Sequence, residues 1–379
     1  MNRIALKMLL GDRAKYLGLI FGIGFATLLM SQQVSIFIGL MSRTASQILD
    51  VREPDVWVMH PRVKYIDEIE AMPEVELSRV RGVEGVAWAV PLYKGNAVIR
   101  SPEGLLQQVI LMGLDDGSLV GRPPQILLGS LADLKRPNAL MLDRAGHEFI
   151  WPGEPLRIGR VVEVNDRRVE IVAIAKASPP FVTFPVVYTR YSEALRFTPP
   201  QRNKLSFVVA KAAAGVGPAE LARRIRARTG LQALTWSEFA WRSVRHYIER
   251  TGIPVNFGIT VTLGFIVGAA VAAQTFYIFV LENLRQFGAL KAIGVTDRQI
   301  LGMVVLQALV VGGLGYAIGI GLCALFFWAT SDVTALLGFV LRWQVMAGTG
   351  VAVAAIMLLS SLASIRKVFV LDPAVVFRG

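Results

Sequence analysis

The chain has 379 residues, of which 54% are hydrophobic and only 18% carry charge. A soluble domain carries about 25% charged residues, so this composition excludes an ordinary soluble protein. The formal net charge is +12. We interpret it as basic flanks of membrane helices plus a mildly basic outer segment, and not as a nucleic-acid-binding surface.

Four stretches without any Asp, Glu, Lys or Arg account for the high hydrophobicity. About 20 apolar residues are enough for a helix to cross a bilayer. We therefore predict four transmembrane helices, each built around one such stretch, at residues 16–42, 251–281, 297–331 and 343–365. The first three are longer than a bilayer requires. A tilted helix and a helix that continues beyond the membrane as a stalk both remain open.

Lys and Arg near the ends of these helices predict the orientation. Basic residues are frequent in residues 1–15, 282–296 and 366–379, whereas the loop 332–342 holds Arg342 alone. We therefore place both termini and residues 282–296 on the cytoplasmic side of the membrane, and residues 43–250 outside the cytoplasm. The first 15 residues are predicted to form an amphipathic segment on the inner face, and an unstructured basic flank is the alternative.

Residues 43–250 are predicted to form an α+β domain with one or two lobes. Strand-like patterns occupy residues 55–59, 98–114, 155–175 and 204–211, and helical patterns occupy residues 68–72, 218–229 and 237–250. Asn165-Asp166 predicts a two-residue hairpin turn, and Ser237 predicts a helix N-cap. Gly and Pro place the lobe joints near residues 121–124 and 178–180. The predicted fold class is an α-helical membrane protein with four transmembrane helices and an extracytoplasmic α+β domain between the first and second.

The charged segment 282–296 separates two of the apolar stretches. An ionisable residue at the bilayer centre costs about 3 kcal/mol, so this segment is predicted to lie at the cytoplasmic face. Apolar residues recur every third position, which predicts an amphipathic helix; they are Leu281, Leu284, Phe287, Leu290 and Ile293. Gly294 is typical of a helix end, and Thr296 with Gln299 forms a capping-box pattern that starts the next helix.

Three patterns resemble the FtsX/MacB-like family of ABC transporter permeases. The first consists of Glu282, Arg285, Leu290, Lys291, Ala292, Ile293 and Gly294. The second is the C-terminal stretch LDPAVVFR at residues 371–378, and the third is residues 22–40, which are most similar to the DevC-like branch. The predicted topology also resembles that of the family.

The resemblance implies a homodimer in a bacterial inner membrane that works with a separate cytoplasmic ATPase. It implies that the ATPase docks on the segment after the second span, at Glu282, Arg285, Phe287, Leu290, Lys291 and Gly294. ATP-driven motion would then pass to the outer domain, to a periplasmic membrane-fusion adaptor and to an outer-membrane channel. The chain contains no G-x-x-x-x-G-K-[ST] motif, so ATP and Mg²⁺ are expected on the partner, and no catalytic residue or cofactor is assigned here.

Small and polar residues inside the spans are candidates for helix packing or for a dimer contact. They are Gly18, Gly22, Gln33, Gly264, Gly268 and Gln274. Membrane lipids are a further expected partner, near the mildly basic outer domain. The three histidines, His60, His147 and His246, are too far apart in the sequence to predict a metal site.

Two other functions remain open at this point. In the first, the same mechanical motion regulates a periplasmic partner such as a cell-wall hydrolase instead of driving export. In the second, the chain is a membrane sensor without an ATPase. The identity of the outer and cytoplasmic partners distinguishes the three functions, and the sequence does not indicate the cargo.

Overall fold

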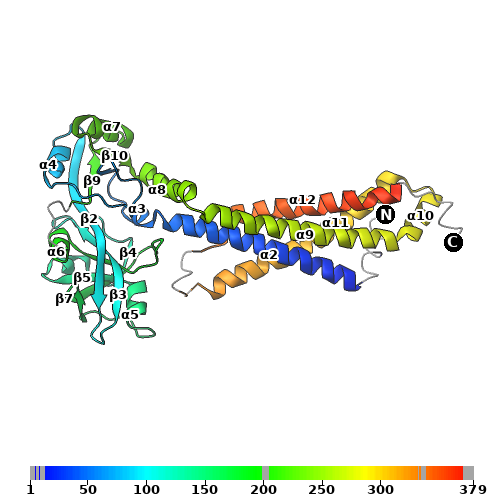
Figure 1. Cartoon of the computed structure of the whole chain (residues 1–379), viewed down its shortest axis with the longest axis horizontal. Coiled ribbons are helices and arrows are strands. Elements are labelled where there is room, and N and C mark those ends of the chain that lie inside the picture. Colours follow the sequence, from blue (N-terminus) through cyan, green and yellow to red (C-terminus); the bar gives the residue numbers. More distant parts are fainter. Residues whose placement is uncertain are drawn as a thin grey trace. The chain divides into compact units, whose positions relative to one another are not determined.

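The computed structural model describes residues 5, 8, 13–198, 205–331, 333 and 339–369. Most of the predicted segment 1–15, most of the loop 332–342 and the tail motif 371–378 lie outside these residues. The chain divides into two compact units, one made of Met1–Gly39 with Gly252–Gly379 and the other of Leu40–Thr251 (Figure 1). Each unit is described by itself.

The first unit is a bundle of helices. Its long helices are α2 (Arg13–Arg43), α9 (Ile253–Glu282), α11 (Asp297–Ala329) and α12 (Trp343–Phe369), and the short α10 (Leu284–Ala292) lies between α9 and α11 in the sequence. Four segments within the long helices are apolar and long enough to cross a membrane, namely Tyr16–Arg43, Ile253–Glu282, Asp297–Ala329 and Trp343–Ser364. The predicted fold class, with an α+β domain between the first and second of these helices, is confirmed.

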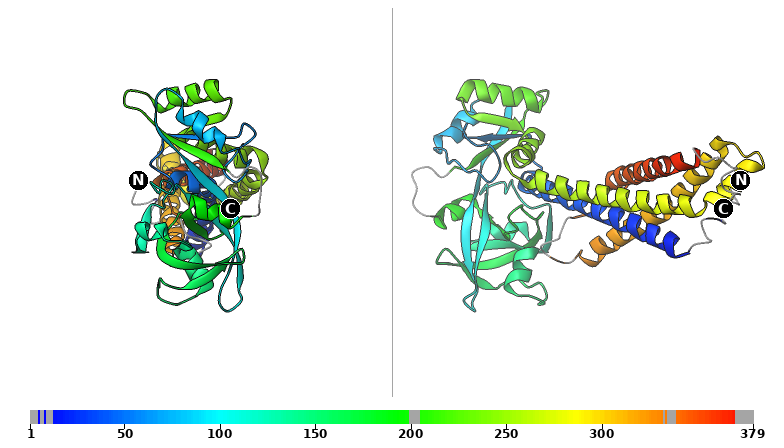
Figure 2. Two further views of the ribbon diagram at one scale, coloured as in Figure 1. Left: turned by 90° about the vertical axis from the view of Figure 1, so that its left-hand side faces the viewer. Right: turned by 45° about the vertical axis from the view of Figure 1, so that its right-hand side comes forward.

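Small residues let α2 approach α9 and α11 closely, as Figure 2 shows for α2 and α9. A Cβ atom at Gly22 would lie 2.5 Å from Val271 of α9, and one at Gly268 would lie 2.7 Å from Ala26 of α2. Gly264 faces Met30 at the ordinary contact distance of 3.4 Å. These predicted packing residues therefore join helices of the same chain.

Gly18 differs from the other glycine candidates. Within the described part of the chain no atom lies within 4 Å of a Cβ placed on it. Gln274 on α9 is exposed and Gln33 on α2 is half-buried. A dimer contact at these three positions remains a prediction.

The second unit is built on a mixed β-sheet. Its strands are β1 (Val56–Met59), β2 (Val86–Arg100), β3 (Leu106–Leu114), β4 (Gln125–Gly129), β5 (Ala139–Asp143), β6 (Val161–Val164), β7 (Arg167–Lys176), β8 (Val186–Arg190), β9 (Phe207–Ala212) and β10 (Gln232–Thr235). The order across the sheet is β10-β1-β9-β2-β3-β8-β5-β7-β4, and β6 pairs with β2 and β7. The helices are α3 (Ser46–Asp50), α4 (Val75–Arg81), α5 (Arg144–Ile150), α6 (Tyr191–Arg196), α7 (Pro218–Thr229) and α8 (Trp236–Arg250), with a 3₁₀ turn, η1, at Leu131–Lys135.

Strand β2 belongs to two groups of strands. Its first half pairs with β9 and its second half pairs with β3. The predicted lobe joints near residues 121–124 and 178–180 are wrong, because these segments connect strands of the same group. Pro and Gly mark the ends of strands, but they do not reveal where a strand changes its partner.

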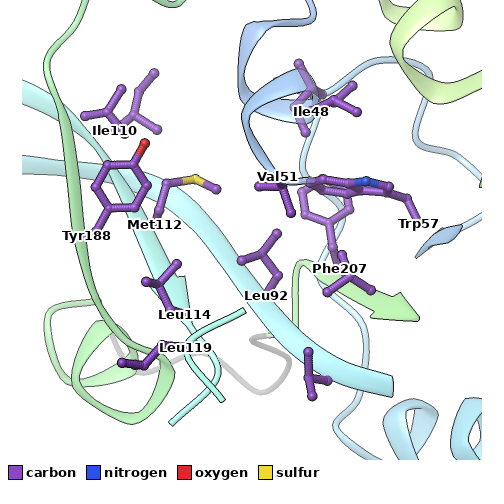
Figure 3. Packing of buried hydrophobic residues seen from close by; sticks show 14 of the residues in the cluster. Ile48, Val51, Trp57, Leu92, Ile110, Met112, Leu114, Leu119, Tyr188 and Phe207 are labelled. Atoms are coloured by element: carbon purple, nitrogen blue, oxygen red, sulfur yellow. The ribbon is translucent and has the colours of Figure 1, made fainter. Parts of the chain in front are cut away.

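One hydrophobic cluster lies on both sides of this change of partner (Figure 3). Trp57 of β1 and Phe207 of β9 meet edge to face with ring centroids 5.4 Å apart. Met112 of β3 and Tyr188 of β8 belong to the same cluster, and Leu92 of β2 lies between these two pairs. The two groups of strands therefore share a buried core at β2.

Several local predictions for this unit fail for identifiable reasons. Residues 68–72 are not helical: Met72 pairs with Leu205 in an isolated bridge, and Pro73 disfavours a helical Met72. Thr235, and not Ser237, caps α8, through a capping box with Glu238. The strand β2 was missed over most of its length because Pro91 and Gly95 are untypical of a strand interior.

Other local predictions agree with the structure. Asn165 and Asp166 have φ of 45° and 63°, as a two-residue hairpin turn between β6 and β7 requires. The predicted helix 218–229 is α7. The predicted helix 237–250 is α8, but it stops at Arg250 and α9 starts at Ile253, so the chain is not one continuous helix there.

Asp143 is a buried carboxyl group that makes the stability of this unit depend on pH. Its Oδ1 accepts a hydrogen bond of 2.7 Å from the N–H of Gly146 and caps α5. Burial raises the pKa of Asp143 to about 7, against the opposing effect of its backbone hydrogen bonds. Between about pH 4 and pH 7 the folded state therefore holds a proton that the unfolded state has released.

Replacing Asp143 with Asn is expected to remove part of the pH dependence of unfolding. In the parent protein this group makes the free energy of unfolding fall as the pH rises from about 4 to 7, by at most about 1.4 kcal/mol per pH unit. Asn keeps the cap and does not ionise, so the variant should be the more stable one at pH 8. Urea unfolding of the outer domain at pH 5 and pH 8 measures this, and an unchanged slope would contradict the assignment.

Candidate docking surface on helix α10

Helix α10 follows α9 after a bend at one residue. Asn283 lies between the two helices, and its Nδ2 donates a hydrogen bond of 2.8 Å to the carbonyl of Phe279. The carbonyl of Asn283 in turn accepts from the N–H of Phe287 at 2.9 Å. The backbone hydrogen bonds therefore continue from α9 into α10 almost without a gap.

Helix α10 ends in a Schellman motif. Gly294 has φ of +92°, a conformation that glycine adopts without strain. The N–H of Val295 donates to Leu290 O at 3.0 Å, and the N–H of Gly294 donates to Lys291 O at 2.9 Å. The next helix starts with the predicted capping box, in which Gln299 Oε1 accepts from Thr296 N at 3.0 Å. Both ends of α10 are thus fixed by local hydrogen bonds.

The inner face of α10 is anchored in the helical bundle. Phe287 is fully buried in a cluster formed by side chains of the bundle helices, and Leu284 and Leu290 pack against the same cluster. Helix α10 itself packs against α9 and α12. The resemblance placed Phe287 on the docking surface, but its side chain cannot touch a partner from this position. Its contribution is to hold α10 against the bundle.

Two residues of the predicted apolar stripe lie outside this inner face. Ile293 is 78% exposed and Leu281 is 37% exposed. A spacing of three residues falls about 60° short of a full helical turn, so the stripe winds around the helix. Only its three central members, Leu284, Phe287 and Leu290, point inward.

Lys291 closes the turn between α10 and α11. Its Nζ lies 2.8 Å from Asp297 Oδ1, and only 12% of its side chain is exposed. The ion pair spans the left-handed Gly294. Lys291 therefore stiffens the connection from inside the turn and offers little surface to a partner.

The outer face of α10 combines charge with small and apolar groups. Its exposed members are Glu282, Arg285, Gln286, Ala289, Ala292, Ile293 and Gly294. Charged residues lie at its start, alanines at its centre and Ile293 at its end. A single exposed apolar side chain is common on protein surfaces, so the docking role of this face is an expectation from the resemblance.

The sequence alone did not single out Ile293 as an outward group. The signal that could have found it is the helical advance: six residues after Phe287 the helix has turned by about 600°, which directs Ile293 about 120° away from the face of Phe287. No three His, Cys, Asp or Glu side chains in the described residues come together as metal ligands would.

Comparisons with known proteins cover both units. Residues 16–228 match the MacB-like periplasmic core domain, and residues 258–373 match the C-terminal region of the FtsX-like permeases. An uncharacterized ABC transporter permease of Mycobacterium tuberculosis is 25% identical over 310 residues, which covers 81% of this chain and 79% of the relative. One of Mycobacterium bovis is 34% identical over 121 residues, 32% of this chain and 33% of the relative.

Two solved outer domains are similar at low identity. The extracellular domain of the noncanonic ABC-type transporter YknZ from Gram-positive bacteria gives a TM-score of 0.35 at 16% identity, over 48% of this chain and 98% of that chain. The periplasmic region of MacB from Actinobacillus actinomycetemcomitans gives 0.38 at 12% identity, over 54% of this chain and 96% of that chain.

Proposed function

Because this chain belongs to the FtsX/MacB-like family of ABC transporter permeases, we propose that it is the membrane subunit through which a separate cytoplasmic ATPase drives export. The family and the four apolar helices make it a multi-pass membrane protein. ATP and Mg²⁺ bind to the ATPase, and this chain contributes no catalytic residue. Both termini and α10 lie on the cytoplasmic side in this proposal.

The observation that carries the proposal is the stiffness of α10 and its two connections. The helix is joined to α9 through the hydrogen bonds at Asn283, and to α11 through the Schellman motif and the Lys291–Asp297 ion pair. A force on the exposed face of α10 therefore displaces the ends of two membrane helices together. A flexible loop at this place would absorb the same force.

The chain offers two different links from the membrane helices to the outer domain. Helix α2 is unbroken from Arg13 to Arg43 and passes from the first unit into the second at Gly39. The other link is interrupted, because Thr251 and Gly252 separate α8 from α9. In this proposal α2 is the stiff link, and the break before α9 lets α8 change its angle.

The proposed partners follow from the family. A second copy of the chain, a membrane-fusion adaptor and an outer-membrane channel would complete a DevC-like exporter in the inner membrane. Export is proposed ahead of a relay to a cell-wall hydrolase because residues 16–228 match the MacB-like core domain.

Affinity purification of the full chain in a mild detergent tests the proposed function. We expect an ABC ATPase to co-purify at a stoichiometry of one per permease, together with an adaptor protein. A cell-wall hydrolase in place of the adaptor would favour the relay. A preparation that is active but contains no ATP-binding subunit would contradict both functions.

A further inference from the structure

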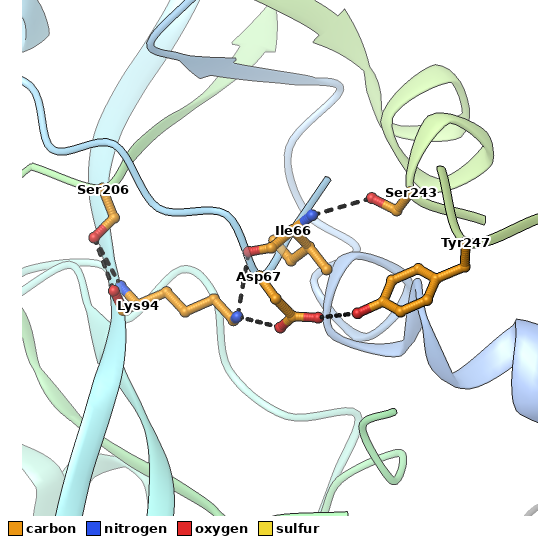
Figure 4. A network of polar contacts seen from close by, with 6 residues as sticks. All are labelled: Ile66, Asp67, Lys94, Ser206, Ser243 and Tyr247. Atoms are coloured by element: carbon orange, nitrogen blue, oxygen red, sulfur yellow. Dashed lines mark hydrogen bonds and ion pairs between the residues drawn. The ribbon is translucent and has the colours of Figure 1, made fainter. Parts of the chain in front are cut away.

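The outer domain contains an ion pair between a buried lysine and a half-buried aspartate, and the docking surface does not use it. Lys94 of β2 is 4% exposed, and its Nζ donates to Asp67 Oδ1 at 2.6 Å and to Ile66 O at 3.2 Å (Figure 4). Burial lowers the pKa of Lys94, and the neighbouring carboxylate of Asp67 opposes that shift. A charge in this position is costly unless its partners stay in place.

Lys94 lies at the point where β2 changes its partner strand. Leu92 is the last residue of β2 that pairs with β9, and Tyr93 is the first that pairs with β3. The backbone of Lys94 is held there by Ser206, whose Oγ accepts from Lys94 N at 3.1 Å and donates to Lys94 O at 3.0 Å. The ammonium group is therefore attached to the junction of the two strand groups.

The other side of the same network is attached to α8. Asp67 Oδ2 accepts a hydrogen bond of 3.3 Å from the hydroxyl of Tyr247. Ser243 Oγ accepts from the N–H of Ile66 at 3.2 Å. In Figure 4, Asp67 lies between Lys94 and Tyr247 and bonds to both. One carboxylate thus connects the strand junction with the helix.

The segment 63–67 follows α8 over successive turns. Arg242 donates to the carbonyls of Val63 and Lys64 at 3.3 and 3.2 Å. The ring of Tyr65 stacks on His246 with centroids 4.2 Å apart. The contacts from Arg242 to Tyr247 hold this segment to the helix, so that a movement of α8 carries Asp67 with it.

An ion pair with a buried lysine is a poor choice if only stability is required. Replacing a buried pair by apolar side chains of similar volume is often neutral or stabilising, whereas removing one partner leaves an uncompensated charge. What the pair adds is a fixed geometry, because both oxygens of Asp67 are used in different directions. This favours a role in positioning.

We propose that Asp67, Lys94 and Tyr247 form a clasp through which the position of α8 sets the angle between the β9 and β3 groups of strands. Through the clasp, a displacement of α8, the helix that precedes the second span, is transmitted to the sheet. Its physiological input rests on the proposed function, since the displacement comes from the ATPase. The three residues are positioning residues and not catalytic ones.

A spin-label distance across the two strand groups tests the clasp in the full chain. Labels at Ala227→Cys on α7 and Glu148→Cys on α5, with Cys323→Ser, report the angle between the groups in nanodiscs without ATPase. We expect Tyr247→Phe and Asp67→Asn to broaden the distance distribution at least about twofold. Tyr247→Phe removes a single hydroxyl and keeps the ring, so this variant is expected to fold like the parent.

The matched control is Lys211→Met. It removes a Lys–Asp pair of similar length, 2.8 Å, between β9 and Asp55, and that pair has no side-chain bond to α8. The spin-label distance distribution of Lys211→Met should equal that of the parent. Unchanged distributions in Tyr247→Phe and Asp67→Asn would overturn the clasp.

The double variant Lys94→Met with Asp67→Asn separates positioning from stability. Removing both charges should restore the melting temperature that Asp67→Asn alone lowers, while the distribution stays broad. A distribution that narrows together with the recovered stability would overturn the positioning role. In the complex with the ATPase, a parent distance that does not respond to ATP would contradict the proposed function and leave the clasp supported by the broadened variants.

Discussion

Replacing Ile293 with Asp is expected to weaken the binding of the ATPase strongly while the permease itself stays folded. The side chain is 78% exposed, so the aspartate remains in water in the free protein. When the docked ATPase covers this position, the aspartate loses its water. Burying such a charge costs about 3 kcal/mol, which is roughly a hundredfold in affinity. Co-purification and the equilibrium binding constant of the ATPase measure the loss.

A control for this variant must introduce the same charge at a comparable surface position. Val75→Asp on α4 fulfils that requirement, because Val75 is 59% exposed and belongs to the outer unit. It should bind the ATPase as tightly as the parent. If Ile293→Asp keeps both ATPase binding and transport, α10 is not the docking surface.

The sequence predicts the membrane helices well because their signal is local and long. Each predicted span starts and ends within two residues of the corresponding apolar segment in the structure. The strand β2 shows the opposite situation. Its pairing with β9 joins residues more than a hundred positions apart, and neither Pro91 nor Gly95 signals it. Contacts of that range leave no periodic pattern in a short stretch.

For the candidate docking surface too, the sequence predicts the local features and not those that depend on distant contacts. The end of α10 at Gly294 and the capping box at Thr296 follow from chemistry within a few residues, and both are present in the structure. The directions of Phe287 and Lys291 depend on the neighbouring helices and on Asp297, so the motif alone could not separate anchoring residues from exposed ones. The docking role of the exposed face is still a prediction.

The anchoring residues make a mechanical role for α10 consistent with its packing. A helix that only bound a partner would need its outer face alone. Here Phe287 is buried in the cluster of the bundle, α10 packs against α9 and α12, and Lys291 pairs with Asp297 at the start of α11. A load on Ile293 therefore reaches three membrane helices through side chains that cannot rotate away. Close packing of α2 against these helices is the second requirement for transmitting the load.

Replacing Gly319 with Leu is expected to disrupt that packing. A Cβ atom at Gly319 would lie 2.5 Å from the carbonyl oxygen of Gly24 and 2.5 Å from Thr27 Cβ, both on α2. A backbone oxygen cannot turn aside as a side chain can, so α2 and α11 have to separate. Overpacking of this kind costs about 1–3 kcal/mol or more, and we expect a lower melting temperature in detergent and a loss of transport.

Gly321→Leu is the matched control on the same helix. It introduces the same side chain two positions away, where a Cβ has no described atom within 4 Å. Leu is a better helix former than Gly by somewhat less than the roughly 0.8–1 kcal/mol that separates Ala from Gly, so this variant should unfold at the same or a higher temperature than the parent. Equal melting temperatures for the two leucine variants would show that α2 and α11 do not touch at Gly319. The path from α10 through α11 to α2 would then lose its physical basis, whatever the ATPase binds.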